Sequence, residues 1–160
     1  MRERQVHTLQ IIYSILEQDP AKSFFPIAEE GDGTGLISRV PHASEVLTGR
    51  FTEPPEFDPS DHRAHRKHEW MTEALRKARE VYFLGEDTGR TMAQAAIKFC
   101  LAQGAIMTVL PNITSMEDLE EYAAAPETPD LTEEESRFID DLWENEFHLE
   151  EAATAPVGDS

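Results

Sequence analysis

Apolar residues follow two alternating periods along this chain, and residues 91–122 show the alternation most clearly. In the first part of this stretch they recur at helical spacing, at Ala93, Ala96, Ile97, Cys100 and Leu101. A short apolar run at 106–110 follows, which predicts a strand buried on both faces in a parallel sheet. Met116, Leu119 and Ala123 then predict the inner face of a second helix. The order helix, strand, helix is typical of an α/β fold.

The ends of these elements have recognisable start and stop residues. Thr91 and Gln94 have the spacing of a capping box, in which each side chain bonds to the backbone N–H of the other residue. Gly104 suits the left-handed position that ends a helix, and Ser115 can cap the helix that follows. The loop 111–114 therefore lies at the carboxyl end of a strand and the amino end of a helix. Parallel α/β sheets bind ligands at such loops, and a helix amino end favours an anion.

The same patterns predict the rest of the architecture. Strands are predicted at 9–13 and 36–40, and helices from Asp19–Pro20 to the glycines at 31–35, at 67–84, at 91–103, and from a second capping box at Thr132 and Glu135. Pro26 predicts either a break in the first of these helices or a new first turn. Strands separated by helices imply right-handed crossovers and a parallel sheet. Three strands are too few to close a barrel, which needs eight.

Length and charge limit the classes of protein to which this chain can belong. Its 160 residues correspond to one domain with enough chain for a core. A formal net charge of −18 argues against a nucleic-acid partner. The chain has no run of about 18 apolar residues, so no membrane span is predicted. Residues 1–15 lack the pattern of a signal peptide. The single cysteine, Cys100, excludes a disulfide framework, fits a buried core residue and indicates a reducing, cytoplasmic compartment.

Several segments, taken in order, resemble one family of enzymes. RTMAQAAIKFCLAQ, TVLPN and EDLEEY are similar to the last barrel helix, last strand and following helix of aldo/keto reductases. LQIIYSILEQ and SRVPHASEVLTGRF resemble the family's sixth strand, and its seventh strand with the loop after it. The resemblance implies a partial (β/α)8 TIM barrel, about strands 6–8 with their helices and a C-terminal helix. It assigns residues 1–149 to the carboxyl-terminal part of such a domain, and we expect 150–160 to be a disordered tail.

The resemblance implies that this part of the barrel binds NAD(P)H, and we expect the chain alone to bind it weakly if at all. Gln10 would bond to the nicotinamide carboxamide and Arg39 would pack on its ring. Without the family, Gln10 fits a residue that satisfies a neighbouring backbone group, and Arg39 a surface or ion-paired residue. The diphosphate would lie along Pro41, the backbone N–H groups of Ala43 and Leu47, the Ser44 hydroxyl, Gly49 and the cation of Arg50. The adenosine end would meet Asn112, Ile113, Thr114, Asp118, Glu121 and Tyr122.

The sequence departs from the family at three points. Glu45 stands where relatives have glycine, and its carboxylate would repel a diphosphate unless it turns outward. Residues 112–114 and Asp118 offer no cation for an adenosine 2′-phosphate, so the sequence does not favour NADPH over NADH. The family's catalytic Asp, Tyr, Lys and His lie on earlier strands, and nothing here matches them. The tyrosines of this chain, Tyr13, Tyr82 and Tyr122, stand in the wrong contexts for the proton donor.

The basic, histidine-rich run HRAHRKH at 62–68 has three interpretations: a solvated loop, a lid over cofactor phosphates, or a metal site, for which its spacing is irregular. The whole chain also has three. It is the cofactor-binding part of a carbonyl reductase, a non-enzymatic interaction or regulatory subunit that retains the half-barrel, or an unrelated small α/β domain. Unpaired strand edges in a partial barrel imply self-association, or a partner chain with the first five strands.

Overall fold

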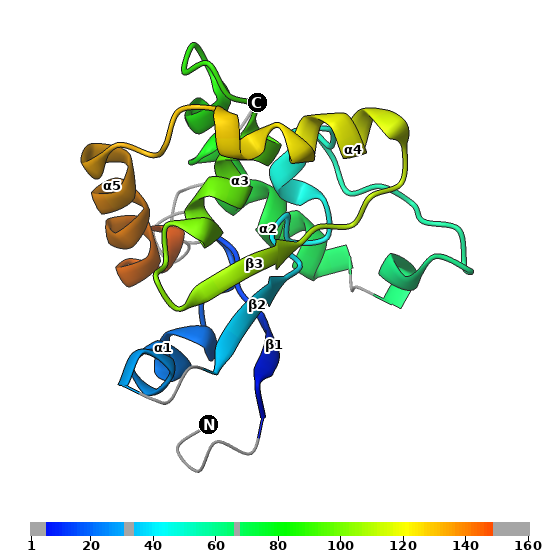
Figure 1. Cartoon of the computed structure of the whole chain (residues 1–160). Coiled ribbons are helices and arrows are strands. Elements are labelled where there is room, and N and C mark those ends of the chain that lie inside the picture. Colours follow the sequence, from blue (N-terminus) through cyan, green and yellow to red (C-terminus); the bar gives the residue numbers. More distant parts are fainter. Residues whose placement is uncertain (1–5, 31–33, 66–67, 149–160) are drawn as a thin grey trace.

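Three parallel strands form one sheet in the computed structural model, which describes residues 6–30, 34–65 and 68–148. The strands are β1 (Thr8–Ile12), β2 (Gly35–Arg39) and β3 (Ile106–Leu110), with β2 in the middle. Both pairings are parallel, with Ile12 opposite Arg39 and Arg39 opposite Leu110. The carboxyl ends of the three strands therefore meet at one edge of the sheet (Figure 1).

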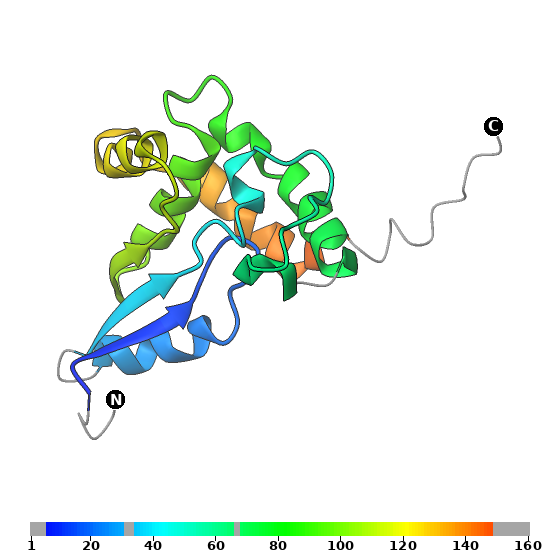
Figure 2. The same ribbon diagram turned by 90° about the vertical axis from the view of Figure 1, so that its right-hand side faces the viewer.

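Helices alternate with the strands, which confirms the predicted α/β order. They are α1 (Ala21–Glu30), α2 (His68–Arg79), α3 (Met92–Leu101), α4 (Met116–Ala123) and α5 (Glu133–Glu144), with short 3₁₀ turns at Val46–Thr48, His62–His65, Tyr82–Gly85, Ala125–Glu127 and Glu146–His148. α1 runs along β1 and β2 (Figure 2), and its Phe25 joins Cys100 of α3, Ile11 and Leu36 in one buried cluster. Cys100 is therefore a core residue, as its helical position predicts.

Two helices begin at the predicted capping boxes. The Gln94 N–H donates to Thr91 Oγ1 at 3.2 Å, and the Thr91 N–H donates to Gln94 Oε1 at 2.9 Å. Thr132 and Glu135 form the same reciprocal pair at the start of α5. Each box satisfies backbone donors that would otherwise have no partner in the first turn of its helix.

Three predictions about the ends and the interior of helices are wrong in detail. α1 starts at Ala21 rather than at Pro20, and it continues through Pro26. Pro26 lies on the exposed side of α1, where solvent can satisfy the carbonyl that loses its bond, while buried Ala21 and Phe25 hold the helix. Gly104 does not have the left-handed backbone expected of it. The chain leaves α3 through bonds from Gln103 N–H to Cys100 O and from Ile106 N–H to Gln103 O instead.

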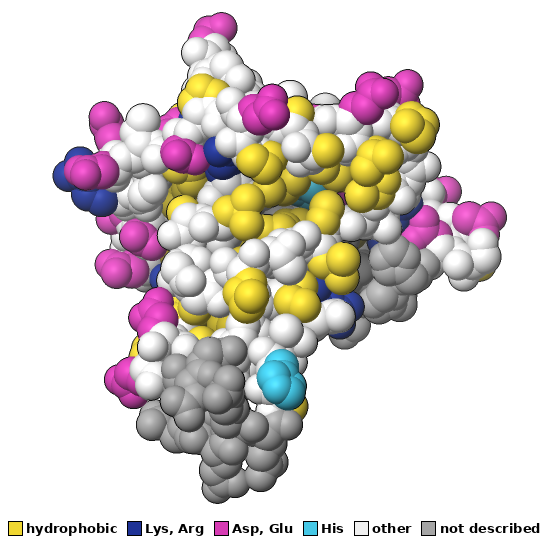
Figure 3. Space-filling view, viewed as in Figure 1, with side chains coloured by type: hydrophobic (Ala, Val, Ile, Leu, Met, Phe, Trp, Pro, Cys, Tyr) yellow, Lys and Arg dark blue, Asp and Glu magenta, His cyan; other side chains and the backbone are white. Residues whose placement is uncertain are grey.

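One face of the sheet is open, which contradicts the expectation that 106–110 is buried on both faces. Within β3 only Ile106 is buried, whereas Met107 is 69% and Leu110 is 53% exposed. β3 is an edge strand, and no helix of the described residues covers the face that bears Gln10, Ile37 and Leu110. Figure 3 shows hydrophobic side chains gathered over β3 and α4 on this side of the molecule.

The inner face predicted for α4 is also wrong. Met116 and Leu119 are 66% and 42% exposed, and the buried residues of α4 are Asp118 and Tyr122. The apolar side chains therefore continue the open surface that begins at β3. The predicted tail, 150–160, lies outside the described residues.

Candidate functional site

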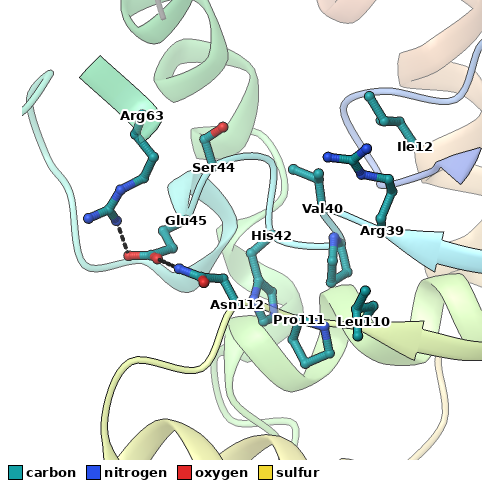
Figure 4. Close-up of a pocket in the computed structure, with 11 residues that line it drawn as sticks. Ile12, Arg39, Val40, His42, Ser44, Glu45, Arg63, Leu110, Pro111 and Asn112 are labelled. Atoms are coloured by element: carbon teal, nitrogen blue, oxygen red, sulfur yellow. Dashed lines mark hydrogen bonds and ion pairs between the residues drawn. The ribbon is translucent and has the colours of Figure 1, made fainter. Parts of the chain in front are cut away.

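A pocket of about 480 Å³ lies at the carboxyl edge of the sheet (Figure 4). It is lined by Ile12, Arg39, Val40, Pro41, His42, Ser44, Glu45, Arg63, Leu110, Pro111 and Asn112. The lining residues come from the ends of all three strands and from the loops that follow β2 and β3. This is the edge at which the alternation of strands and helices predicts a ligand site.

The loop after β2 forms a tight spiral that is anchored in the core. Val40, Ala43, Ser44 and Glu45 have φ values of 58°, 46°, 58° and 71°, in the left-handed region that non-glycine residues seldom occupy. Val46 and Leu47 are fully buried and hold this backbone in place. Strained backbone of this kind persists only where the surrounding structure over-determines it.

This spiral uses the backbone donors that the resemblance assigns to a diphosphate. The Ala43 N–H donates to Val40 O and the Leu47 N–H donates to His42 O, each at 3.0 Å. Neither group is therefore a free donor, in contrast to the expectation. Ser44 is half-buried in the lining, and Gly49 ends the following 3₁₀ turn with φ of 74° and open space around it.

Glu45 does not turn outward. Its carboxylate accepts hydrogen bonds from Arg63 Nη1 at 2.6 Å and from Asn112 Nδ2 at 2.9 Å, and the residue is 8% exposed (Figure 4). Glu45 therefore connects the loop after β2 with Arg63 and with the loop after β3, and Arg63 partly offsets its charge. Arg63 also pairs with Asp61 at 2.6 Å. The contact of Arg63 with Glu45 brings part of the histidine-rich run to the pocket. Residues 66–67 and the side chains of His62 and His65 lie outside the described structure.

Arg39 is a predicted cofactor residue that lines the pocket. It ends β2, its side chain is exposed, and no ion pair to it occurs within residues 6–30, 34–65 and 68–148. Figure 4 shows its guanidinium beside Ile12. Gln10 lies on the same face of the sheet, opposite Ile37, but it does not line the pocket.

A second polar cluster lies at the amino end of α4, where the resemblance places the adenosine end. Asp118 Oδ2 accepts bonds from the Thr114 N–H at 2.9 Å and the Thr114 hydroxyl at 2.7 Å. Arg50 Nη2 donates to Asp118 Oδ1 at 2.5 Å and to Glu121 Oε2 at 3.4 Å. The Thr114 hydroxyl and N–H, with the Arg50 guanidinium, hold the pKa of the Asp118 carboxyl well below its usual range. Arg50 is thus paired with two acidic residues. The side chain of Ile113, in the same loop as Thr114, is 47% exposed.

Glu121 is bonded to neighbouring elements, whereas Tyr122 is buried and its hydroxyl has no hydrogen-bond partner among the described residues. Glu121 Oε1 accepts the Thr91 hydroxyl at 2.6 Å, and its backbone carbonyl accepts Gln94 Nε2 at 2.9 Å. Tyr122 is 5% exposed, and burial raises the pKa of its hydroxyl to about 12. Its ring packs on His42, with 4.6 Å between the ring centroids.

His42 is a pocket residue that the sequence interpretation missed. Its Nε2 lies 3.1 Å from Ala93 O, and burial lowers the pKa of the imidazole. The signal that could have pointed to it is its place within SRVPHASEVLTGRF, the segment that supplies the other predicted residues of this loop. The tyrosines give no such signal, and none of Tyr13, Tyr82 and Tyr122 lines the pocket.

Residues 6–30, 34–65 and 68–148 contain neither a metal-binding cluster nor a membrane-spanning helix. No group of three or more His, Cys, Asp or Glu side chains is arranged to hold a metal ion there. None of the helices in these ranges is long and apolar enough to cross a membrane.

Comparisons with known proteins agree on one family. The model of the Aldo/keto reductase family matches residues 2–144. Aldo-keto reductase str7 of Strobilurus tenacellus is 30% identical over 152 residues, which cover 89% of this chain and 45% of that protein. L-glyceraldehyde 3-phosphate reductase of Escherichia coli is 28% identical over 152 residues, which cover 89% of this chain and 43% of that protein.

Solved structures show the same fold. Glycerol dehydrogenase AKR11B4 from Gluconobacter oxydans superposes with a TM-score of 0.69 at 19% identity, covering 96% of this chain and 45% of that one. The holo form of aldo-keto reductase AKR11C1 from Bacillus halodurans gives 0.62 at 23% identity, with 88% and 44% covered. The chain thus spans less than half the length of these relatives. Its three parallel strands are consistent with part of their barrel, and the chain belongs to the aldo/keto reductase family.

Proposed function

We propose that this chain is the cofactor-binding portion of an aldo/keto reductase, strands six to eight of the (β/α)8 barrel with the C-terminal helix. In the complete, cytoplasmic protein it would serve the NAD(P)H-dependent reduction of aldehydes or ketones to alcohols. The observation on which this proposal rests is the pocket of about 480 Å³ at the carboxyl edge, with Arg39 at its wall. When bound, the dinucleotide supplies the hydride.

The residues of the pocket fit a planar, anionic ligand. The Arg39 guanidinium can stack on a ring and attract a negative charge, because within the described residues no carboxylate pairs with it. Ser44 adds a hydroxyl at the wall. Arg63 lies between Glu45 and Asp61 beside it, so the repulsion expected from an isolated Glu45 carboxylate is partly offset.

The test is dinucleotide binding by the chain, measured as enhancement of NADH fluorescence. We expect Arg39→Met to weaken binding about tenfold, which corresponds to about 1.4 kcal/mol. Arg137→Met is the matched control, because Arg137 is an exposed residue of α5 that lies outside the pocket. Equal affinities for the two variants would contradict the proposal.

Binding is expected without turnover. The proton donor of the family has no counterpart in this sequence, and the three tyrosines lie outside the pocket. General acid catalysis supplies about 10²–10⁴-fold in rate, so its absence leaves the 160-residue chain without measurable carbonyl reduction. Aldehyde turnover above a blank with NADH or NADPH would contradict this expectation.

The open face of the sheet favours a second, compatible role in association. Met107, Leu110, Ile113, Met116 and Leu119 are all more than 40% exposed and lie along β3, the loop after it and α4. Exposed apolar surface next to an unpaired strand edge is a contact site. We propose that it packs against the first five strands of the barrel, in the same protein or in a partner chain, or against a second copy. An interaction or regulatory subunit would use the same surface.

A further inference from the structure

A second cavity, of about 780 Å³, lies between α2 and the loop at 52–54, which runs alongside this helix (Figure 2). It shares no lining residue with the pocket at the carboxyl edge of the sheet. The buried Leu75 and the half-buried Pro54 contribute apolar surface, and charged side chains of both signs surround them. Its volume lies in the range of about 300–1,000 Å³ that is usual for sites that bind small ligands.

The charges of this cavity are segregated along α2. Glu69 and Glu73 line it from the first half of the helix, and Arg76 and Arg79 line it from the last turn. This order also suits the helix dipole, which favours acidic residues at the amino end and basic residues at the carboxyl end. The dipole does not require the four side chains to face one cavity, however, and here they do. A ligand that complements them carries a positive charge at one end and a negative charge at the other.

The two arginines are held in place by neutral groups. Arg76 Nη2 donates to Phe147 O at 2.7 Å, and Arg79 Nη2 donates to Thr52 O at 3.0 Å. No ion pair between either arginine and a carboxylate occurs within residues 6–30, 34–65 and 68–148. A guanidinium has five N–H groups, so each arginine keeps donors for a ligand carboxylate. Because both side chains are already fixed, binding costs less of their conformational freedom.

The acidic end of the cavity offers a carboxylate at a defined separation from the arginines. Glu73 is paired with Lys77 at 2.8 Å, whereas no ion pair to the exposed Glu69 occurs in the described part of the chain. Glu69 precedes Arg76 by seven positions, which is about 10 Å along a helix that rises 1.5 Å per residue. An extended peptide covers that distance with about three residues.

We propose that this cavity binds short peptides of about three residues through their free termini. The peptide carboxylate bonds to the guanidinium groups of Arg76 and Arg79, and the peptide ammonium group bonds to Glu69. The peptide backbone lies over Leu75. Glu53, on the loop side, makes the cavity unsuitable for a ligand that is anionic throughout, and the net charge of −18 repels such ligands further. The proposal is independent of dinucleotide binding.

Tri-alanine is the probe, because its side chains add no charge. Backbone amide chemical shifts of the full chain follow the titration, and we expect a dissociation constant on the order of 1 mM. N-acetyl-tri-alanine and tri-alanine amide each lack one terminal charge, so each should bind about threefold more weakly. Equal binding of the free and the blocked peptides would overturn the proposal, and so would shift changes that avoid α2 and the loop at 52–54.

Two variants assign each peptide terminus to its residue. Glu69→Gln should weaken tri-alanine binding about threefold and remove the effect of acetylation, whereas Arg79→Met should weaken it similarly and reduce the effect of amidation. Glu117→Gln and Arg137→Met are the matched controls, at exposed positions of α4 and α5, and should bind like the natural chain. A loss that is the same for all three peptides would contradict the assignment. Glu69 is exposed and unpaired among the described residues, so Glu69→Gln keeps the test decisive if Arg79→Met does not fold.

Discussion

Single residues in this protein differ sharply in what surrounds them, and two glycines show this most simply. A Cβ at Gly85 would lie 2.5 Å from the Met92 backbone nitrogen, where the 3₁₀ turn at Tyr82–Gly85 packs on the start of α3. A Cβ at Gly35 would also collide, but with the Met107 sulfur, which is the end of a flexible and 69% exposed side chain. The Met92 backbone cannot move aside as easily as the flexible Met107 side chain can.

We therefore predict that two alanine substitutions reduce the free energy of unfolding by different amounts. Gly85→Ala should reduce the free energy of unfolding by about 1–3 kcal/mol, because the start of α3 must move. Gly35→Ala should change it by less than about 0.5 kcal/mol, because Met107 can swing into solvent. Thermal and urea unfolding of both variants would measure the difference, and similar losses for the two would contradict this close approach at Gly85.

Because His42 is buried, it should make the protein less stable as the pH falls. Burial lowers the imidazole pKa in the folded state, so as the pH falls below about 6.5 the unfolded chain takes up a proton that the folded chain does not. The Ala93 carbonyl, Glu121 and Glu45 act against this shift, and Arg50 acts with it. The free energy of unfolding must therefore decline as the pH falls from about 6.5 towards the lowered pKa, by at most about 1.4 kcal/mol per pH unit.

We predict that His42→Gln flattens this part of the stability curve. A glutamine amide can still donate to the Ala93 carbonyl but does not titrate. His7→Gln is the control, because His7 is exposed. Urea unfolding at several values between pH 5 and 7 provides the measurement, and parallel curves for His42→Gln and the natural chain would show that His42 does not contribute.

At the scale of elements, the helices depend on local signals to different degrees. α3 and α5 both begin with a capping box, but Thr91 of α3 also donates its hydroxyl to Glu121, so the cap of α3 is linked to α4. Thr132 of α5 is exposed, and its hydroxyl accepts the Glu135 N–H of its own helix.

Replacing each cap by alanine should separate these contributions. Thr132→Ala should lower the free energy of unfolding by about 1 kcal/mol, and Thr91→Ala by more, because it leaves Glu121 without this donor. Thr72→Ala is the control, since this hydroxyl bonds to the His68 carbonyl within α2 and caps nothing. Chemical unfolding measures all three, and a loss at Thr72 as large as that at Thr91 would contradict the assignment.

The whole molecule presents an open sheet face beside an unpaired strand edge. The apolar surface from Met107 to Leu119 has no cover among the described residues, and β3 has a free edge. A net charge of −18 keeps chains apart in solution, but it does not pair the backbone of an edge strand.

We predict that the chain alone is marginally stable and self-associates, unless a partner with strands one to five is present. Leu110→Lys combined with Met116→Lys should shift sedimentation towards the monomer, whereas Phe138→Lys, at an exposed apolar residue of α5, should not. Analytical ultracentrifugation and thermal unfolding provide the test. A monodisperse monomer of the natural chain with a cooperative, ordinary melting transition would contradict the partial-barrel interpretation.

Features that depend on neighbours in the sequence could be predicted without a structure. The three strands, their order, the two capping boxes and the burial of Cys100 follow from periodicity and from the bonding needs of backbone groups within a few residues. The position of the site at the carboxyl edge follows from the parallel order of the strands.

The tertiary structure alone decided which charges meet and which apolar side chains stay uncovered. Glu45 finds Arg63 and Asn112 across 18 and 67 positions, and Asp118 finds Arg50 across 68. With 32 acidic and 14 basic residues in the chain, the sequence offers each arginine many partners, and only the meeting of the loops selects one. Periodicity likewise predicted Leu119 on the inner face of a helix, but whether anything covers it depends on the elements packed beside α4, and the described residues leave it 42% exposed.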